Sequence, residues 1–252
     1  MIKDLEKIVL EETKRSSASH SFNHLLRVAK GAEWFCDILK ATKHEKEVAY
    51  SAGLLHDIVR PPTEKYDPLE ESMEKSKKIL QKLKIDKKLA KEILDAIYAH
   101  HFPDPEKKAG YSVFLADKIL EQMGAYIIFR RAIFMGESPD FKKMDRRKSI
   151  IEHWTVRMEK WPPSKFEKQF APLVKYQFQW MEKFLLAFKN KEEWAAHLNN
   201  YFFEAGQKGI QTDTAISSFK PKFEEEKEYL EETLSYIRGK KMIQFRGMID
   251  SI

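Results

Sequence analysis

Four segments of the chain each place an imidazole or a carboxylate on an otherwise apolar helical surface. They contribute His24, His56 with Asp57, His100, and Asp117. Burying Asp57 and Asp117 as unpaired carboxylates is costly, and the cost falls if they share a cation. Neutral imidazoles combined with carboxylates suit a divalent transition metal whose open positions hold water. The residue types favour a metal centre over a purely structural polar cluster, but spacing alone does not show that the groups converge.

The elements that must position these groups are predicted to be helices, because apolar residues recur with a period of about 3.6 along most of the chain. No strand-like alternation of useful length is found, so the fold class is predicted to be all-α. Pro61 and Pro62 cannot continue a helix and end the second segment, and Asp86 is the expected N-cap of the fourth. The helices of the first half are expected over 22–39, 48–59, 69–84, 86–101 and 111–123.

The first predicted helix is preceded by a second histidine, one turn before His24. His20 and His24 are four residues apart, so on one helix they would share a face. His24 interrupts an apolar stripe between Phe22 and Leu25, and its side chain is therefore expected to point inward.

The second half is also predicted to be helical, after a break at "KWPPSKF", residues 160–166. An aromatic stripe over 166–188 is typical of packing, either onto the N-terminal core or onto another subunit. We therefore expect two parts: residues 1–130 as a helical metal-binding domain, and residues 131–252 as a C-terminal helical extension packed on it.

Composition restricts the class of protein. Hydrophobic residues make up 42% and charged residues 33%, which is typical of a soluble globular chain. The single cysteine, Cys36, excludes an internal disulfide and a cysteine-based zinc site. No apolar run reaches the ~20 residues of a membrane span and no secretory signal is recognised, so a cytoplasmic location and no membrane partner are expected.

The net charge of +6 is modest for 252 residues. Several lysines recur among acids on one predicted helix surface, which favours a solvated helix face over a nucleic-acid groove. They are Lys75, Lys77, Lys78, Lys82 and Lys84. Nucleic acid is therefore a disfavoured partner, whereas an anionic small substrate is easily accommodated.

The motifs that carry the candidate groups resemble a known family. "HSFNHLLRVA", "AGLLHDI", "AIYAHH" and "LADKIL" occur in this order, and together they are similar to the HD superfamily of metal-dependent phosphohydrolases. The similarity covers about residues 16–130, where "EESMEKSKKIL" and "MGAYIIFR" resemble the general bacterial and archaeal branch. It implies an HD-domain helical bundle.

The resemblance also implies roles for individual residues. The implied metal ligands are His24, His56, Asp57 and Asp117, for a divalent ion that the sequence leaves open among Mn, Fe, Co, Ni, Zn and Mg. Asp57 is the implied catalytic residue, because it both ligates and orients the attacking water. The candidates for a second metal or for substrate phosphate are His100, His101, His20 and Arg60.

The sequence departs from the nucleotidase-like pattern after the doublet, where Arg60 and two prolines stand in place of a glutamate. Arg60 is expected either to pair with a phosphate or to interact with a helix end. An acidic helper could come from any of four residues, and the sequence does not choose among Glu64, Asp67, Glu70 and Glu71.

The expected reaction is hydrolysis of a phosphoester or phosphoanhydride of a small phosphorylated metabolite, with a nucleotide as the favoured class. Four aromatic residues near motif-bearing helix ends are candidates for stacking a base, with core packing as the alternative for each: Tyr66, Tyr98, Phe102 and Tyr111. A non-catalytic metal-bound signalling module and a nucleic-acid-processing hydrolase stay open as alternatives, the latter because of "FKKMDRRKS" at 141–149. A homo-oligomer also stays open.

Overall fold

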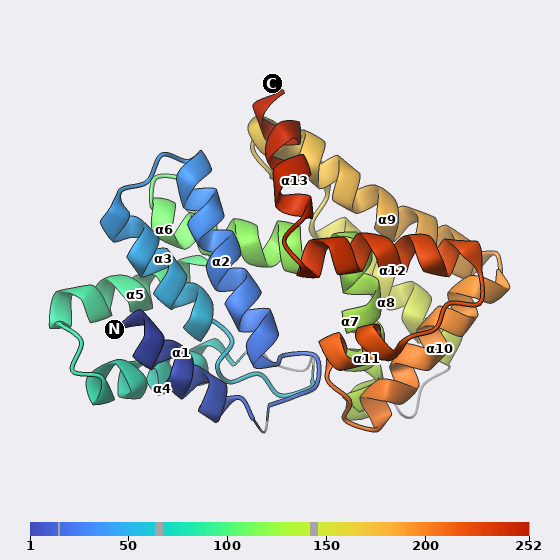
Figure 1. Cartoon of the computed structure of the whole chain (residues 1–252), viewed down its shortest axis with the longest axis horizontal. Helices are drawn as coiled ribbons and strands as arrows, with labels where there is room; N and C mark the ends of the chain where they lie inside the picture. The colour runs from blue at the N-terminus through green and yellow to red at the C-terminus, as the bar shows by residue number, and fades with distance from the viewer. Residues whose placement is uncertain (15, 64–67, 142–145, 252) are drawn as a thin grey trace. The chain divides into compact units, whose positions relative to one another are not determined.

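The computed structural model describes residues 1–14, 16–63, 68–141 and 146–251, and this part of the chain is helical with no strand. The all-α prediction is therefore confirmed for the described residues (Figure 1). Contacts divide the chain into two compact units, Met1–Glu121 and Gln122–Ile252. The division predicted at residue 130 lies inside a helix of the second unit, Gly124–Glu137.

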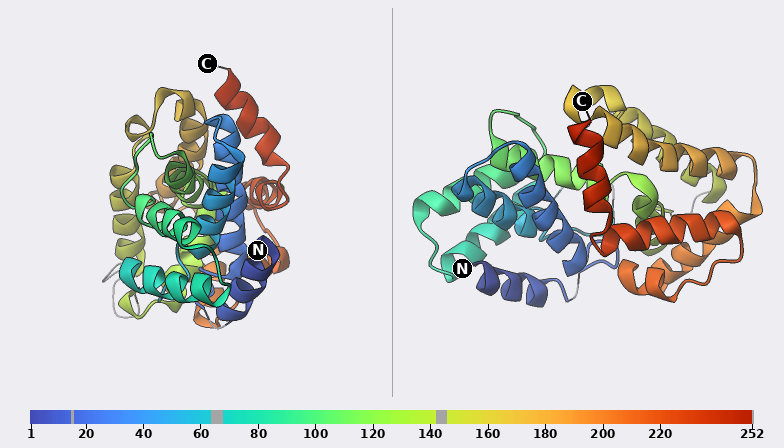
Figure 2. Two further views of the ribbon diagram at one scale, coloured as in Figure 1. Left: turned by 90° about the vertical axis from the view of Figure 1, so that its left-hand side faces the viewer. Right: turned by 45° about the horizontal axis from the view of Figure 1, so that its top comes forward.

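The first unit contains six α-helices among its described residues and ends in a π-helix. These elements are α1 (Ile2–Glu12), α2 (Phe22–Ile38), α3 (Lys43–Leu55), α4 (Leu69–Lys82), α5 (Lys87–Ala99), α6 (Lys108–Leu115) and the π-helix η1 (Ala116–Glu121). Helices α3 and α6 pack against each other and both contact α2 and α5, and α2 also packs against η1. The same group is seen in blue and green in both views of Figure 2.

Helix α3 lies unusually close to α2, because Gly53 has no Cβ. A Cβ at this position would lie 2.6 Å from the Cα atom of Ala29 and 2.8 Å from its backbone nitrogen. The approach matters for the site, because α2 carries His24 and α3 leads directly into His56 and Asp57.

Side-chain caps fix where two of these helices begin. Asp86 caps α5 by accepting hydrogen bonds from the backbone N–H groups of Lys88 and Leu89, as predicted. Thr42 and Glu45 form a capping box at the start of α3.

The structure corrects three expectations about these helices. The helix expected over 48–59 ends at Leu55, and the helix expected over 111–123 is divided into α6 and η1. His20 does not share a helix with His24, because α2 begins at Phe22 with Ser21 as its N-cap.

The second unit is built around α7 (Gly124–Glu137), whose residues from Gly124 to Gly136 are all buried. Helices α9, α10, α11 and α12 all pack on α7. The remaining elements of this unit are η2 (Pro139–Phe141), α8 (Arg146–Lys160), η3 (Pro163–Lys165), η4 (Lys168–Phe170), α9 (Ala171–Lys189), α10 (Glu193–Gln207), α11 (Thr212–Ser218), α12 (Glu224–Ile237) and α13 (Lys241–Asp250).

Two glycines let α7 and α10 touch through their backbones. A Cβ at Gly136 would lie 2.0 Å from the carbonyl oxygen of Phe203, and a Cβ at Gly206 would lie 2.1 Å from that of Ile133. The aromatic stripe predicted over 166–188 serves mainly as packing, since Phe170, Phe184 and others along α9 are buried.

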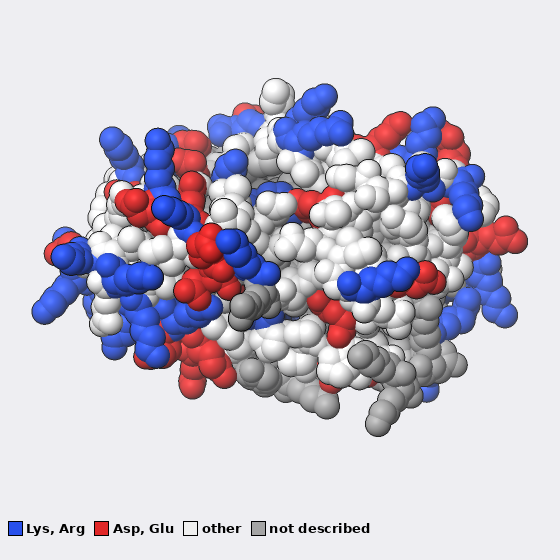
Figure 3. Space-filling model, turned by 60° about the horizontal axis from the view of Figure 1, so that its bottom comes forward, with Lys and Arg blue, Asp and Glu red and all other residues white. Residues whose placement is uncertain are grey.

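Charged side chains of both signs share the surface. On the face shown in Figure 3, lysine and arginine are interspersed with aspartate and glutamate. On α4, Lys75 pairs with Glu12 at 3.0 Å and Lys78 pairs with Glu74 at 3.2 Å. This arrangement agrees with a solvated mixed-charge face, as expected for the lysines of this helix.

Candidate metal centre

His56 lies at the C-terminal end of α3, where it is the C-cap residue and only 1% exposed. Its Nδ1 is 2.8 Å from the carbonyl oxygen of Gly53. Because a carbonyl can only accept, Nδ1 carries the proton and Nε2 presents its lone pair. Nε2 is buried without a hydrogen-bond partner among the described residues, which is costly unless a ligand occupies it.

His24 is fully buried on α2, as its place in the apolar stripe predicted. Its Nδ1 is 2.8 Å from Oε2 of Glu121, and the other carboxylate oxygen of Glu121 accepts a hydrogen bond from Nε of Arg27 at 2.7 Å. A carboxylate paired with a guanidinium is ionised, so Nδ1 of His24 donates and its Nε2 is the nitrogen left to bind a metal.

His100 is the C-cap of α5 and is 1% exposed. Its Nδ1 is bonded to the carbonyl oxygen of Ile97, which again leaves the lone pair on Nε2. Burial, with the charges of His56 and His101 next in effect, lowers the pKa of His100 well below its usual value. His100 is therefore a neutral imidazole, the form that binds metals.

Asp117 lies in the π-helix η1 and is 1% exposed. Its Oδ2 accepts a hydrogen bond from Nζ of Lys118 at 2.5 Å, and its Oδ1 lies 3.9 Å from Nε2 of His56. Burial would raise the pKa of Asp117, but the charges of Lys118, His56 and His24 lower it well below the usual range. Asp117 is thus ionised, with one oxygen turned toward His56.

Asp57 follows His56 directly, and its Oδ2 lies 3.7 Å from Nε2 of that histidine. Burial opposes its ionisation, but the charges of Arg60, His56 and His20 lower the pKa below its ordinary value. Arg60 is close to this carboxylate, with Nη1 4.0 Å from Oδ1, and it lies five residues after the last residue of α3.

These side chains converge in the N-terminal unit. His24, His56 and Asp117 each offer a ligand atom within 4.8 Å of the others, and so do His56, Asp57 and His100. Ligand atoms about 2.1 Å from one ion lie roughly 3 to 4 Å apart, close to the carboxylate distances measured from Nε2 of His56. The two groups share His56, so they adjoin each other.

The imidazoles form a continuous series of neighbouring rings. Ring centroids are 5.7 Å apart for His20 and His24, 5.4 Å for His24 and His56, and 5.1 Å for His56 and His100. The series continues to His101, 4.0 Å from His100. The donor set therefore fits a divalent ion: buried imidazoles held through Nδ1 beside ionised carboxylates.

The other candidate residues occupy different positions around this cluster. His20 is 5% exposed, and its Nδ1 lies 3.0 Å from the hydroxyl of Ser19 and 3.1 Å from that of Ser17. Among the four candidate acidic helpers, Glu70 and Glu71 are exposed in the first turn of α4. Glu64 and Asp67 lie outside the described residues, as do Tyr66 and residues 142–145 of the basic cluster.

Sequence reasoning missed Glu121. Glu121 is completely buried and holds His24, and Lys118 is buried beside Asp117. A signal for Glu121 was present: it lies four residues after Asp117, so both share a helix face, and it is a charge at the end of an apolar run.

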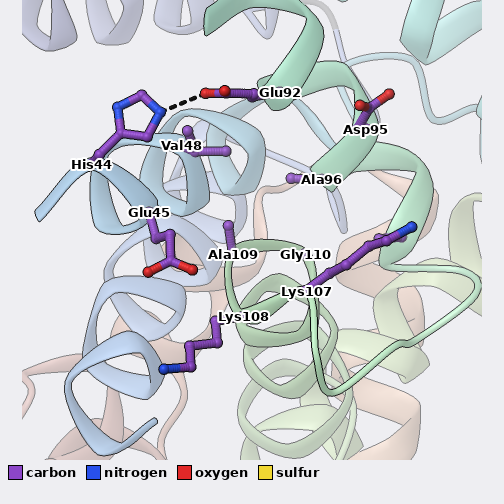
Figure 4. Close-up of a pocket in the computed structure, with 11 residues that line it drawn as sticks. His44, Glu45, Val48, Glu92, Asp95, Ala96, Lys107, Lys108, Ala109 and Gly110 are labelled. Atoms are coloured by element: carbon purple, nitrogen blue, oxygen red, sulfur yellow. Dashed lines mark hydrogen bonds and ion pairs between the residues drawn. The ribbon is translucent and has the colours of Figure 1, made fainter. Parts of the chain in front are cut away.

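A hollow of about 250 Å³ lies in the same unit, between the starts of α3 and α6 and one face of α5. Its rim carries both signs of charge, and His44 is hydrogen-bonded to Glu92 across it (Figure 4). The metal-ligand candidates are not among the residues that line it.

Comparison with known proteins agrees with the geometry. Residues 21–132 match the family model described as the HD domain. This segment is therefore similar to the HD superfamily of metal-dependent hydrolases, which confirms the resemblance drawn from the sequence motifs. No curated protein and no solved structure matches the chain.

None of the described helices combines the length and the apolar character that crossing a bilayer requires.

Proposed function

We propose that this chain is a metal-dependent phosphohydrolase that cleaves a phosphoester or phosphoanhydride of a small phosphorylated metabolite, with a nucleotide as the favoured class. The observation that carries the proposal is that Nε2 of His56 lies near the carboxylates of both aspartates. Its buried Nε2 lies between the carboxylates of Asp57 and Asp117, at 3.7 and 3.9 Å, and a divalent cation is the species that these three groups would bind together.

His24, His56, Asp57 and Asp117 are the proposed ligands, and His100 is within reach of the same position. A divalent ion bound there supplies a water of lowered pKa and neutralises charge on a phosphoryl oxygen.

A cytoplasmic location and a homo-oligomeric state of this protein stay predictions.

The remaining side chains have roles that follow from their charge and position. Asp57 is the most exposed of the proposed ligands, at 11% for its side chain, so it can orient a water that approaches from solvent. Arg60 lies beside it and can bind a phosphate oxygen with two N–H groups. His20 and His101 are at the two ends of the ring series, and their proposed role is to donate hydrogen bonds to a phosphate or a leaving group.

The proposal is tested by elemental analysis of the purified protein together with a screen of phosphorylated metabolites against several divalent metals. We expect about one metal ion per chain and metal-dependent release of phosphate. Asp57→Ala should abolish release, whereas the control Asp95→Ala, which removes an exposed carboxylate on α5, should leave it unchanged.

Less than one ion per chain, with no activity after metal is restored, would overturn the enzyme reading. One ion per chain without any phosphatase activity would instead favour a non-catalytic metal-bound module.

A further inference from the structure

Two aromatic side chains at the end of α5 are exposed together. Tyr98 is 49% and Phe102 is 59% exposed, although each could bury a large apolar surface. Their rings stack on each other, with centroids 4.9 Å apart and planes inclined by 28°. Mutual stacking holds the two rings in a fixed orientation and leaves an outer aromatic face open to solvent.

This pair is continuous with the candidate metal centre. The ring of Phe102 is 6.4 Å from that of His101, which is 4.0 Å from His100, and His100 is 5.1 Å from His56. Exposure falls along this series from 59% at Phe102 to 1% at His100 and His56. The aromatic pair is therefore the solvent end of a path of rings that begins at the buried ligands.

We propose that Tyr98 and Phe102 form a stacking subsite for the base of a nucleotide whose phosphate reaches the metal centre. The inference rests on the proposed phosphohydrolase function and adds where the rest of the substrate lies. An aromatic face accepts any base, because every base has a π-face. A nucleotide carries its base one ribose away from its 5′-phosphate, and only His101 separates Phe102 from His100 in the chain.

Other candidates for this role fit less well. Tyr111 is 4% exposed and stacks on Phe114 in the core, so it is a packing residue. The hollow in Figure 4 is lined by alanines and by charges of both signs, and His44 carries the one ring among its lining residues. Neither offers an open aromatic face next to the metal ligands.

The test is direct binding of two probes, adenosine 5′-monophosphate and glycerol phosphate, to metal-free and Mn²⁺-loaded protein by calorimetry. For Phe102→Ala we expect the affinity for adenosine 5′-monophosphate to fall roughly 5- to 150-fold, the range that removal of one stacked ring produces. Affinity for glycerol phosphate should not change. Phe102→Trp should retain base binding, and Leu10→Ala, which removes an exposed side chain on α1 of the same unit, is the matched control.

Several outcomes would overturn the subsite: equal affinity of the wild type for both probes, an equal loss for both probes in Phe102→Ala, or no loss at all. A change of oligomeric mass in Phe102→Ala with nucleotide binding intact would also overturn it and would identify an interface between copies. If binding depends on the base but no hydrolysis occurs, the stacking subsite is supported and the phosphohydrolase proposal fails. If hydrolysis occurs but binding does not depend on the base, the phosphohydrolase proposal is supported and the stacking subsite fails.

Discussion

Glu121 is a buried carboxylate that holds His24, one of the proposed metal ligands. It is 0% exposed, holds Nδ1 of His24 at 2.8 Å, and is itself held by Arg27. This bond fixes the tautomer and the ring orientation of His24 and makes its Nε2 more basic. On the proposed function, Glu121 is thus a positioning residue for the candidate metal centre.

We predict that Glu121→Gln weakens metal binding about 10- to 100-fold, because the amide neither fixes the tautomer nor supplies charge. Competition with a chromophoric chelator measures the affinity. Glu92→Gln is the matched control, since Glu92 makes the same kind of bond to the exposed His44, away from the centre. If both variants weaken binding equally, Glu121 has no positioning role.

A second prediction at this scale concerns Cys36. Burial is the main cause that raises the pKa of its thiol to about 11, although a hydrogen bond to Ser112 at 3.2 Å acts in the opposite direction. At pH 8 the thiol is almost entirely protonated, and only the thiolate reacts. We expect no reaction of the native protein with a disulfide reagent at pH 8 and one equivalent after unfolding. Fast labelling of the native protein would contradict this burial.

At the scale of elements, the apolar period predicted the helices well, because each buries one stripe and the stripe repeats every 3.6 residues. The predicted end of this helix, at residue 59, was wrong for a physical reason, since α3 ends at Leu55. The backbone N–H and C=O of Val59 are bonded to the hydroxyl of Ser72 on α4, at 3.2 and 3.0 Å. Val59 is therefore bonded to a residue 13 positions later in the chain and not to a neighbouring helical turn. The local apolar pattern carries no information about such a contact.

The residues of the candidate site likewise fall into those that local sequence motifs predict and those that only the packed structure reveals. His56, Asp57 and Asp117 follow from motifs, because each motif is local. The bond between His24 and Glu121 joins residues 97 apart in sequence, so only the packing of α2 on η1 reveals it. The exposure of Tyr98 and Phe102 was likewise beyond sequence reasoning, since an aromatic residue at a helix end is equally compatible with the core.

The contact between α2 and α3 gives a prediction for an element pair. Gly53→Ala must displace the backbone of Ala29, and we expect a loss of about 1–3 kcal/mol of unfolding free energy together with lower metal occupancy. Denaturant melts and elemental analysis measure the two effects.

Gly247→Ala is the control, because a Cβ there meets open space in α13 and should leave stability equal or slightly higher. Similar melts for the two variants would show that α2 and α3 have room to separate.

At the scale of the whole molecule, all the proposed ligands lie in the unit Met1–Glu121, whereas α7 and α10 build the other unit. Gly206→Ala would bring a Cβ within 2.1 Å of the carbonyl oxygen of Ile133. We predict that this variant lowers thermal stability but retains one metal ion per chain. Loss of metal in the folded variant would show that the C-terminal unit is required to form the centre.

The π-helix has a consequence for evolutionary comparison. A turn closed by i→i+5 bonds contains about one residue more than an α-turn, so η1 is equivalent to a single-residue insertion around Asp117. Relatives that lack the insertion would need a one-residue gap within "ADKILE" to align Asp117 and Glu121 with their own carboxylates. An alignment that places this gap outside the motif would assign the ligand role to the wrong neighbour, and the carboxylate that supports His24 would be overlooked.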